Sequence, residues 1–252
     1  MTTPPGCPGP ERPGAGRGTV AAIYNSAVAA WAIAAGAFDE VYRYKSFFHW
    51  LSRGNAELFR QMPSVLVGEN RAGDFYQRDA AAIAYACREI DELCYAPTFW
   101  DAMERLDFEL SNVVDVGCGS GGRVLDILAR YPRARGIGVD IARPALDVAR
   151  ASSRARGAAD RVTFVQADVL DLDERPEFAD IELITCFMMG HDLWPRENCV
   201  AALRRFRKVF PSAQRFLPTV ADWESLFDEA GWELMRTNMI DMTVGEVVFE
   251  LG

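Results

Sequence analysis

The chain contains 252 residues, of which 50% are apolar and 25% are charged, and its formal charge is −9 at pH 7. This acidic balance argues against nucleic acid as a partner, because phosphates attract basic surfaces. No apolar run approaches the ~20 residues that a membrane-spanning helix needs, so we also expect no membrane partner. The six cysteines form no CxxC pair, which favours reduced thiols and a cytoplasmic location.

The first part of the chain predicts a tail followed by helices. Residues 1–18 are rich in Pro and Gly, which is typical of a flexible tail and not of a secretory signal. Alanine-rich residues 19–38 and the strings SFFHWLSRGNAELFRQM and YQRDAAAIAYACREIDELCY have helical patterns, and no strand-like run interrupts them. We therefore predict an all-helical region over residues 19–108.

From residue 109 onward, predicted strands alternate with predicted helices. The strands are expected at 112–116, 136–141, 161–168, 181–189 and 246–251, and the helices at 123–130, 144–157, 197–210 and 222–230. This alternation predicts an α/β domain over residues 109–252, with a mainly parallel sheet covered by helices on both faces.

A glycine-rich turn follows the first predicted strand, in the string VVDVGCGSGG. Glycines such as Gly117 and Gly119 allow positive φ angles and a close approach of ligand to backbone. Asp140 ends the second predicted strand, where a carboxylate can accept both hydroxyls of a ribose. Asp168 ends the third, where a carboxylate can accept a hydrogen bond from an adenine amino group. Together these positions predict a nucleoside-containing cofactor.

These motifs resemble those of the class I S-adenosylmethionine-dependent methyltransferases, whose glycine loop is typically preceded by an acidic residue, as Asp115 is here. The resemblance implies a Rossmann-like fold and S-adenosylmethionine as cofactor. The residues that it assigns to the cofactor are Asp115, Gly117, Gly119, Asp140, Ile141, Asp168 and Val169. Two alternatives stay open. Gly122 completes a GxGxxG spacing, which is also found where a nicotinamide cofactor binds. The glycines could also form tight turns that bind no ligand.

A second candidate site follows the fourth predicted strand, in the string GHDLWPRENC. His191 in this string is one of two histidines in the chain. A histidine after a strand is often structural, but the carboxyl ends of parallel strands are also where ligands bind. We therefore expect His191 to take part in the reaction.

Longer strings carry a more specific resemblance. The chain is similar to small-molecule O-methyltransferases with an N-terminal helical dimerisation region, and more closely to the phenylpyruvate C-methyltransferases of bacterial antibiotic and other natural-product pathways. The matching strings are FFHWLSRGNAELFRQMP, FYQRDAAAIAYACREI, CFMMGHDLWPRENCV and VVFEL. The resemblance implies methylation of the β-carbon of an aryl or branched 2-oxo acid, by a homodimer whose helical region covers the pocket.

The same resemblance implies a metal. In that family a non-haem iron binds two histidines, chelates the 2-oxo acid and stabilises its enolate, and His191 matches the first histidine. The other matches are a carboxylate-binding arginine, a polar partner and two pocket positions: Arg78, Asp192, Trp50 and Met188. Taken without the resemblance, the arginine could form a surface ion pair and the two pocket residues could be core.

Two segments of the family pattern are missing from this sequence, so a chain with this resemblance is expected to be longer. One is a winged-helix segment before FFHW, and the other supplies the second metal histidine; the only other histidine here is His49. One imidazole with water and carboxylate ligands selects iron poorly, which keeps Mg²⁺ as an alternative. Three further readings stay open: prenyl diphosphate C-methylation with Mg²⁺, phenol O-methylation with His191 as base, and a non-catalytic cofactor-binding protein.

Overall fold

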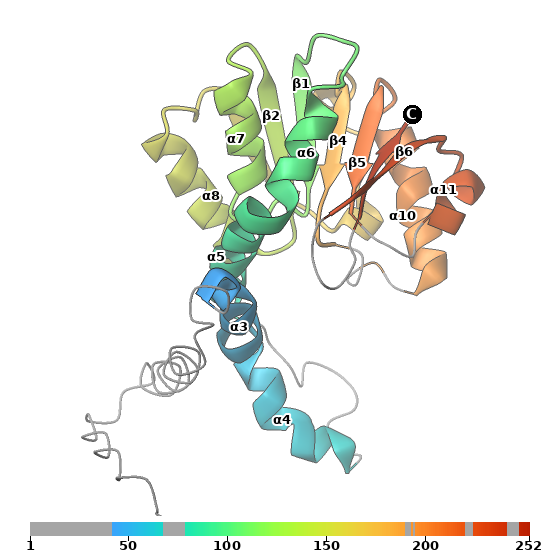
Figure 1. The fold of residues 1–252 in the computed structure, drawn as a ribbon. Coiled ribbons are helices and arrows are strands. Elements are labelled where there is room, and N and C mark those ends of the chain that lie inside the picture. Colours follow the sequence, from blue (N-terminus) through green and yellow to red (C-terminus); the bar gives the residue numbers. More distant parts are fainter. Residues whose placement is uncertain (1–41, 68–78, 190–192, 194, 220–223, 241–246) are drawn as a thin grey trace, which may run out of the picture.

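The computed structural model describes residues 42–67, 79–189, 193, 195–219, 224–240 and 247–252 (Figure 1). The predicted tail over residues 1–18 and the predicted helix over residues 19–38 lie outside these ranges. Within them, no helix is both long and apolar enough to cross a membrane.

Every described element before residue 112 is a helix. The elements are α3 (Lys45–His49), η1 (Trp50–Gly54), α4 (Ala56–Leu66), α5 (Ala80–Ile90), η2 (Asp91–Tyr95) and α6 (Ala96–Met103). Asp79 caps α5, where its carboxylate accepts a hydrogen bond from the Ala82 N–H at 3.0 Å. The helical character agrees with the sequence prediction, while the boundaries at residues 19 and 108 stay predictions.

The rest of the described chain forms a seven-stranded sheet in the order β3-β2-β1-β4-β5-β7-β6. Its strands are β1 (Asn112–Val116), β2 (Arg135–Asp140), β3 (Val162–Gln166), β4 (Leu183–Cys186), β5 (Arg215–Pro218), β6 (Leu234–Met239) and β7 (Val247–Leu251). The first five are parallel, and β7 pairs antiparallel with both β5 and β6. The prediction of a mainly parallel sheet is confirmed.

Helices cover both faces of this sheet, as predicted. The main ones are α7 (Gly122–Arg130), α8 (Arg143–Ala155), α10 (Arg196–Val209) and α11 (Glu224–Ala230). Alternate residues of β1 enter two separate cores: Val114 packs in the core that contains α10, and Val113 packs in the core that contains α6, α7 and α8. Asp115 therefore points to the same side as Val113, toward α7.

Two predicted strands end earlier in the structure. The strand expected to reach Asp168 ends at Gln166, and the strand expected to reach Met189 ends at Cys186. The residues just beyond both strands line the pocket, among them Asp168 and Met188.

Strands β5 and β6 were both absent from the predicted order. Strand β5 has only four residues and runs from Arg215 to Pro218, so it forms no clear apolar run. Most residues of β6 are exposed, and an edge strand of this kind shows no apolar alternation.

Candidate active site

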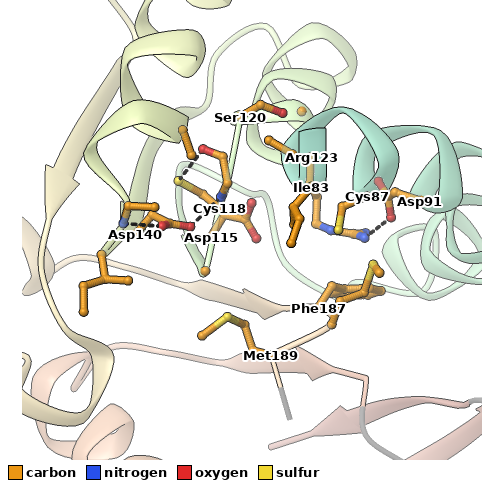
Figure 2. Close-up of a pocket in the computed structure, with 18 of the residues that line it drawn as sticks. Ile83, Cys87, Asp91, Asp115, Cys118, Ser120, Arg123, Asp140, Phe187 and Met189 are labelled. Carbon is orange, nitrogen blue, oxygen red and sulfur yellow. Dashed lines mark hydrogen bonds and ion pairs between the residues drawn. The ribbon is translucent and has the colours of Figure 1, made fainter. Parts of the chain in front are cut away.

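A pocket of about 640 Å³ opens at the carboxyl ends of β1, β2 and β4, beside helix α5 (Figure 2). This volume lies in the range of small-molecule sites. One wall comes from the sheet and the glycine turn, and the other from helices between residues 42 and 103, which we call the cover region. The cover region contributes Trp50, Ile83, Ala84, Cys87, Arg88 and Asp91 to the pocket lining.

The glycine turn exposes its backbone to the pocket. Gly117 and Gly119 adopt φ angles of +72° and +52°, a region that side chains with a Cβ rarely enter. A Cβ on Gly117 would also lie 2.3 Å from Cγ of Met189, whereas a Cβ on Gly119 would have no atom within 4 Å. The turn therefore packs tightly against Met189 at Gly117, and it leaves room for a ligand at Gly119.

Asp140 at the end of β2 holds this turn in place. One carboxylate oxygen accepts a hydrogen bond from the Gly119 N–H at 2.8 Å, and the other accepts from the Ala142 N–H at 2.7 Å. A carboxylate has about four acceptor positions, so two N–H contacts leave capacity for ribose hydroxyls. The residue predicted as a ligand acceptor is thus also a positioning residue for the loop.

The next pocket residues follow β2 and β3. Ile141 is 64% exposed, which is unusual for a large apolar side chain, and it lines the pocket. Asp168 does not end β3 as predicted. Instead it caps the short turn Val169–Asp171, where it accepts a hydrogen bond from the Leu170 N–H at 2.9 Å. Val169 is buried, so only part of it meets the pocket.

Asp115 lies buried beneath the glycine turn. Its carboxylate accepts a hydrogen bond from the Thr185 hydroxyl at 2.6 Å. Burial raises the pKa of Asp115 to about 6, although the nearby Arg123 charge and this hydrogen bond both act to lower it. Asp115 therefore gains a proton and loses its charge at mildly acidic pH.

An ion pair between Asp91 and Arg123 joins the cover region to the catalytic side of the pocket (Figure 2). The Arg123 guanidinium carbon lies 3.3 Å from the ring centroid of Phe187 and 4.6 Å from that of Phe99. Burial raises the pKa of Asp91, against the lowering effect of Arg123. Sequence reasoning missed this pair, although an arginine on the apolar face of α7, one turn from buried Ile127, was a usable signal.

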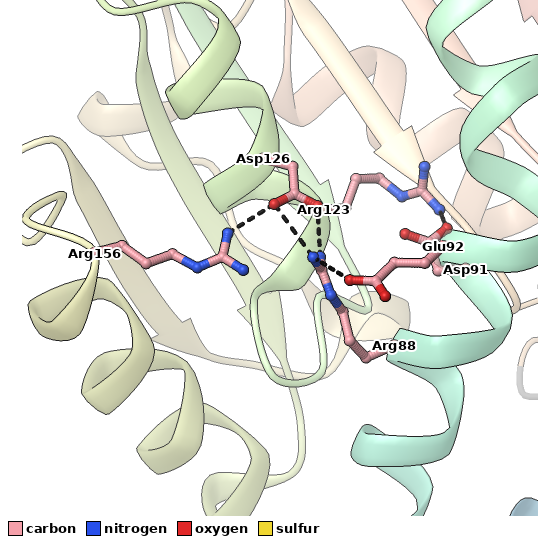
Figure 3. Close-up of polar contacts among 6 residues, drawn as sticks. All are labelled: Arg88, Asp91, Glu92, Arg123, Asp126 and Arg156. Atoms are coloured by element: carbon pink, nitrogen blue, oxygen red, sulfur yellow. Dashed lines mark hydrogen bonds and ion pairs between the residues drawn. The ribbon is translucent and has the colours of Figure 1, made fainter. Parts of the chain in front are cut away.

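A second polar cluster fixes α5 against α7 and α8 (Figure 3). Arg88 of α5 pairs with Asp126 of α7 at 2.5 Å and with Glu92 at 2.6 Å. Arg156, just after α8, pairs with the same Asp126 at 2.7 Å. The shared carboxylate links the cover region to two helices of the sheet domain.

The two predicted acceptor-pocket positions do line the pocket. Trp50 is the first residue of the π-helical turn η1, and such turns often mark functional sites. Met188 follows β4 with a φ angle of +58°, a strained conformation for a residue with a side chain. Its N–H donates to the Thr219 hydroxyl oxygen at 3.0 Å, which holds this conformation.

Three predicted residues, Arg78, His191 and Asp192, lie outside the described residues. The described neighbours Met189 and Leu193 both line the pocket. The other histidine, His49, packs on the ring of Tyr85 with centroids 5.2 Å apart and is not among the pocket-lining residues.

Comparisons with known proteins identify the family. A model of the methyltransferase domain matches residues 113–211. The chain is 41% identical to methyltransferase ungE' of Aspergillus campestris over 254 aligned positions, which cover 84% of this chain and 74% of that protein. The chain belongs to the class I S-adenosylmethionine-dependent methyltransferases.

This methyltransferase is also similar to two further proteins. It is 32% identical to indolepyruvate C-methyltransferase of Streptomyces griseus over 132 residues, which cover 52% of this chain and 37% of that protein. Its fold is similar to that of the O-methyltransferase NcsB1 from neocarzinostatin biosynthesis, with a TM-score of 0.59 and 19% identity over 80% of this chain and 71% of that one. The Rossmann-like fold is confirmed.

The pocket suits the methyl donor of this family. S-adenosylmethionine combines an adenine, a ribose and a charged amino-acid end, and the pocket offers an exposed isoleucine, strand-end carboxylates and a buried ion pair. All seven residues assigned to the donor from sequence line the pocket: Asp115, Gly117, Gly119, Asp140, Ile141, Asp168 and Val169. Their individual contacts with the donor stay predictions.

Proposed function

We propose that this methyltransferase methylates the β-carbon of an aryl or branched 2-oxo acid in natural-product biosynthesis. The observation that carries the proposal is the lining of the pocket, which includes Trp50, Ile83, Phe187 and Met188 as well as the glycine turn. Aromatic and apolar walls suit an aryl or branched side chain. The partial identity to an indolepyruvate C-methyltransferase supports the choice of a 2-oxo acid.

In this proposal the protein mainly orients two reactants. The donor, when bound, supplies a methyl group on a positively charged sulfur. Asp140 and Asp168 hold its nucleoside, and Arg78 pairs with the carboxylate of the acceptor. Holding the β-carbon in line with the methyl group lowers the entropic part of the barrier, which can account for several kcal/mol.

His191 and Asp192 complete the proposed site together with a metal ion, iron or Mg²⁺. The metal would supply Lewis-acid stabilisation of the negative charge on the keto oxygen. Among the described residues, no group of three or more His, Cys, Asp or Glu side chains is arranged to hold a metal. The proposal assigns the metal to His191 because the sequence resemblance implies it.

The test is a panel of acceptors offered with S-adenosylmethionine: phenylpyruvate, a branched 2-oxo acid, geranyl diphosphate and a simple phenol. We expect the 2-oxo acids to gain one methyl group, and we expect chelation to reduce turnover and added metal to restore it. His191→Ala should lose at least about 100-fold in kcat/KM. His49→Ala, on Tyr85 and outside the pocket lining, is the matched control and should retain activity. Methylation of the diphosphate or the phenol alone would refute the proposal.

A further inference from the structure

We infer that Gly54 determines how large an acceptor side chain this methyltransferase admits, because it gives the Ile83 side chain room outside the pocket. This role rests on the proposed function, in which the acceptor lies among apolar and aromatic residues of the lining: Trp50, Ile83, Phe187 and Met188. Gly54 is not among the pocket-lining residues. It is therefore a positioning residue, and its effect on the acceptor passes through Ile83.

Gly54 lies where two helical segments of the cover region touch. It is buried, and it ends η1, the π-helical turn that begins with Trp50. This turn packs against α5, which carries Ile83. A Cβ on Gly54 would lie 2.5 Å from Cγ1 and 3.2 Å from Cδ1 of Ile83. The first distance is too short for two non-bonded carbon atoms, so any side chain at this position would force a shift.

Space, and not backbone conformation, requires a glycine at position 54. The φ angle of Gly54 lies outside the left-handed region, so a residue with a Cβ could adopt the same backbone. A glycine within a helical turn also costs backbone entropy. The close approach of Ile83 is the feature that explains a glycine here.

The contacts around Gly54 leave Ile83 as the group that would move. The Gly54 carbonyl oxygen accepts a hydrogen bond from the N–H of Asp79, the N-cap residue of α5, at 3.0 Å. Within the turn, Nδ2 of buried Asn55 donates to the Trp50 carbonyl oxygen at 2.9 Å. These bonds hold the turn against the start of α5. Since a β-branched side chain in a helix has one strongly preferred rotamer, Ile83 cannot rotate away at low cost.

A side chain at position 54 would therefore press Ile83 into the pocket. Ile83 and Cys87 both reach the pocket from α5 (Figure 2). A change of one methylene in an apolar pocket alters selectivity by roughly 10- to 200-fold. A 2-oxo acid with an aryl group needs the space beside Ile83, whereas one with a single methyl group does not. Gly54 thus favours large acceptors.

The first experiment compares phenylpyruvate with 2-oxobutanoate, which carries a methyl group in place of the phenyl group. We expect Gly54→Ala to lower the ratio of their kcat/KM values, phenylpyruvate over 2-oxobutanoate, at least about tenfold. The KM for S-adenosylmethionine should stay within about twofold of its wild-type value. Gly54→Ala/Ile83→Ala should restore the ratio, because the new Cβ then meets no isoleucine. Arg53→Ala, at an exposed position of the same turn, is the matched control and should leave the ratio unchanged.

Two results would overturn the inference. One is an equal loss of activity with both acceptors in a folded Gly54→Ala protein, which would show a purely structural role. The other is a double variant with the same low ratio as Gly54→Ala. If Gly54→Ala does not fold, Gly54→Ala/Ile83→Val replaces it, because valine lacks Cδ1 and relieves part of the crowding. Its ratio should then be lower than that of Ile83→Val alone, and equal ratios would contradict the role of Gly54.

A second experiment measures the space in the pocket without an acceptor. Cys87 lies one turn after Ile83 on α5 and also lines the pocket. Cys118 lines it too, but burial raises the pKa of its thiol well above the ordinary value, so it should react slowly. Methyl and benzyl methanethiosulfonate differ in the size of the group that they attach to a thiol, and mass spectrometry of the Cys87 peptide reports the labelling rate.

We expect Gly54→Ala to slow benzyl labelling of Cys87 at least about threefold more than methyl labelling, and Gly54→Ala/Ile83→Ala to remove this difference. Equal changes for both reagents would contradict the inference. Because no acceptor is involved, the labelling result stands even if no 2-oxo acid is methylated. Failure of the inference is therefore distinguishable from failure of the proposed reaction.

Discussion

Burial of the carboxyl groups in the pocket disfavours their charged forms, because a buried carboxylate loses its interactions with water. Asp115 and Asp91 both have raised pKa values because burial penalises the carboxylate, and Arg123 offsets only part of that penalty for each. Strongly shifted groups in a cleft are typical of functional sites.

Asp115 should make the stability of the protein depend on pH. A carboxyl pKa near 6 in the folded state, against 3.8 as the reference, means that the folded state binds the proton more tightly. The free energy of unfolding should therefore fall as the pH rises from about 4 to about 6, by up to about 3 kcal/mol from this group. Urea unfolding of the wild type and of Asp115→Asn across this range should diverge by that amount. Parallel curves would contradict the assignment.

Asp140 should control donor affinity through both the ribose and the loop. We expect Asp140→Asn to weaken S-adenosylhomocysteine about 10- to 100-fold, since one charged acceptor is lost and the Gly119 N–H contact is disturbed. Calorimetry measures this directly. Asp147→Asn, exposed on α8, is the matched control and should bind normally. Unchanged affinity of Asp140→Asn would remove the residue from the donor site.

At the scale of elements, the attachment of α5 determines how the pocket is closed. Arg88 ties α5 to Asp126 on α7, and this contact is partly exposed to solvent, so its contribution is about 1 kcal/mol. We expect Arg88→Met to speed amide exchange in residues 80–90 about fivefold while exchange in β1 is unchanged. Equal acceleration in both elements would indicate global destabilisation instead.

Helix α4 extends away from the sheet domain (Figure 1). Several of its apolar side chains are exposed to solvent. Leu66 is 71% exposed, and Phe59 and Met62 are also exposed. This surface is where we place the contact of the homodimer that the sequence resemblance implies.

Light scattering after size exclusion tests the dimer. The wild type should have the mass of two chains, and Phe59→Lys/Leu66→Lys should have the mass of one, because buried lysines oppose the contact. Met235→Lys, at an exposed methionine on β6, is the control and should stay dimeric. A monomeric wild type, or a dimer that survives the double substitution, would refute this placement.

The elements themselves were largely predictable from sequence. Local rules sufficed for β1, the glycine turn and α7, because a buried apolar run, turn glycines and a helical period are all short-range signals. They failed at β5, a strand of four residues, at β6, an exposed edge strand, and at the ends of β3 and β4. There the chain leaves the sheet because residues such as Asp168 and Met188 are held by contacts with other segments.

At the scale of the whole molecule, the pocket exists only because two parts of the chain meet. The donor residues predicted from sequence are all on the sheet side, where the motif is continuous along the chain. Asp91 and Arg123 are 32 residues apart and come together through tertiary packing, so no local pattern marks them as partners. The pocket residues on the sheet side could therefore be predicted from sequence, and the ion pair between the two parts could not.

The reaction is defined by the acceptor and by the atom of the acceptor that receives the methyl group. The most direct measurement is nuclear magnetic resonance of the product formed from phenylpyruvate and a donor with a ¹³C-labelled methyl group. We expect the label to be bonded to the β-carbon and its signal to be split by coupling to that carbon's single remaining hydrogen. A labelled methyl on oxygen, or no labelled product from any 2-oxo acid while another acceptor is methylated, would contradict it.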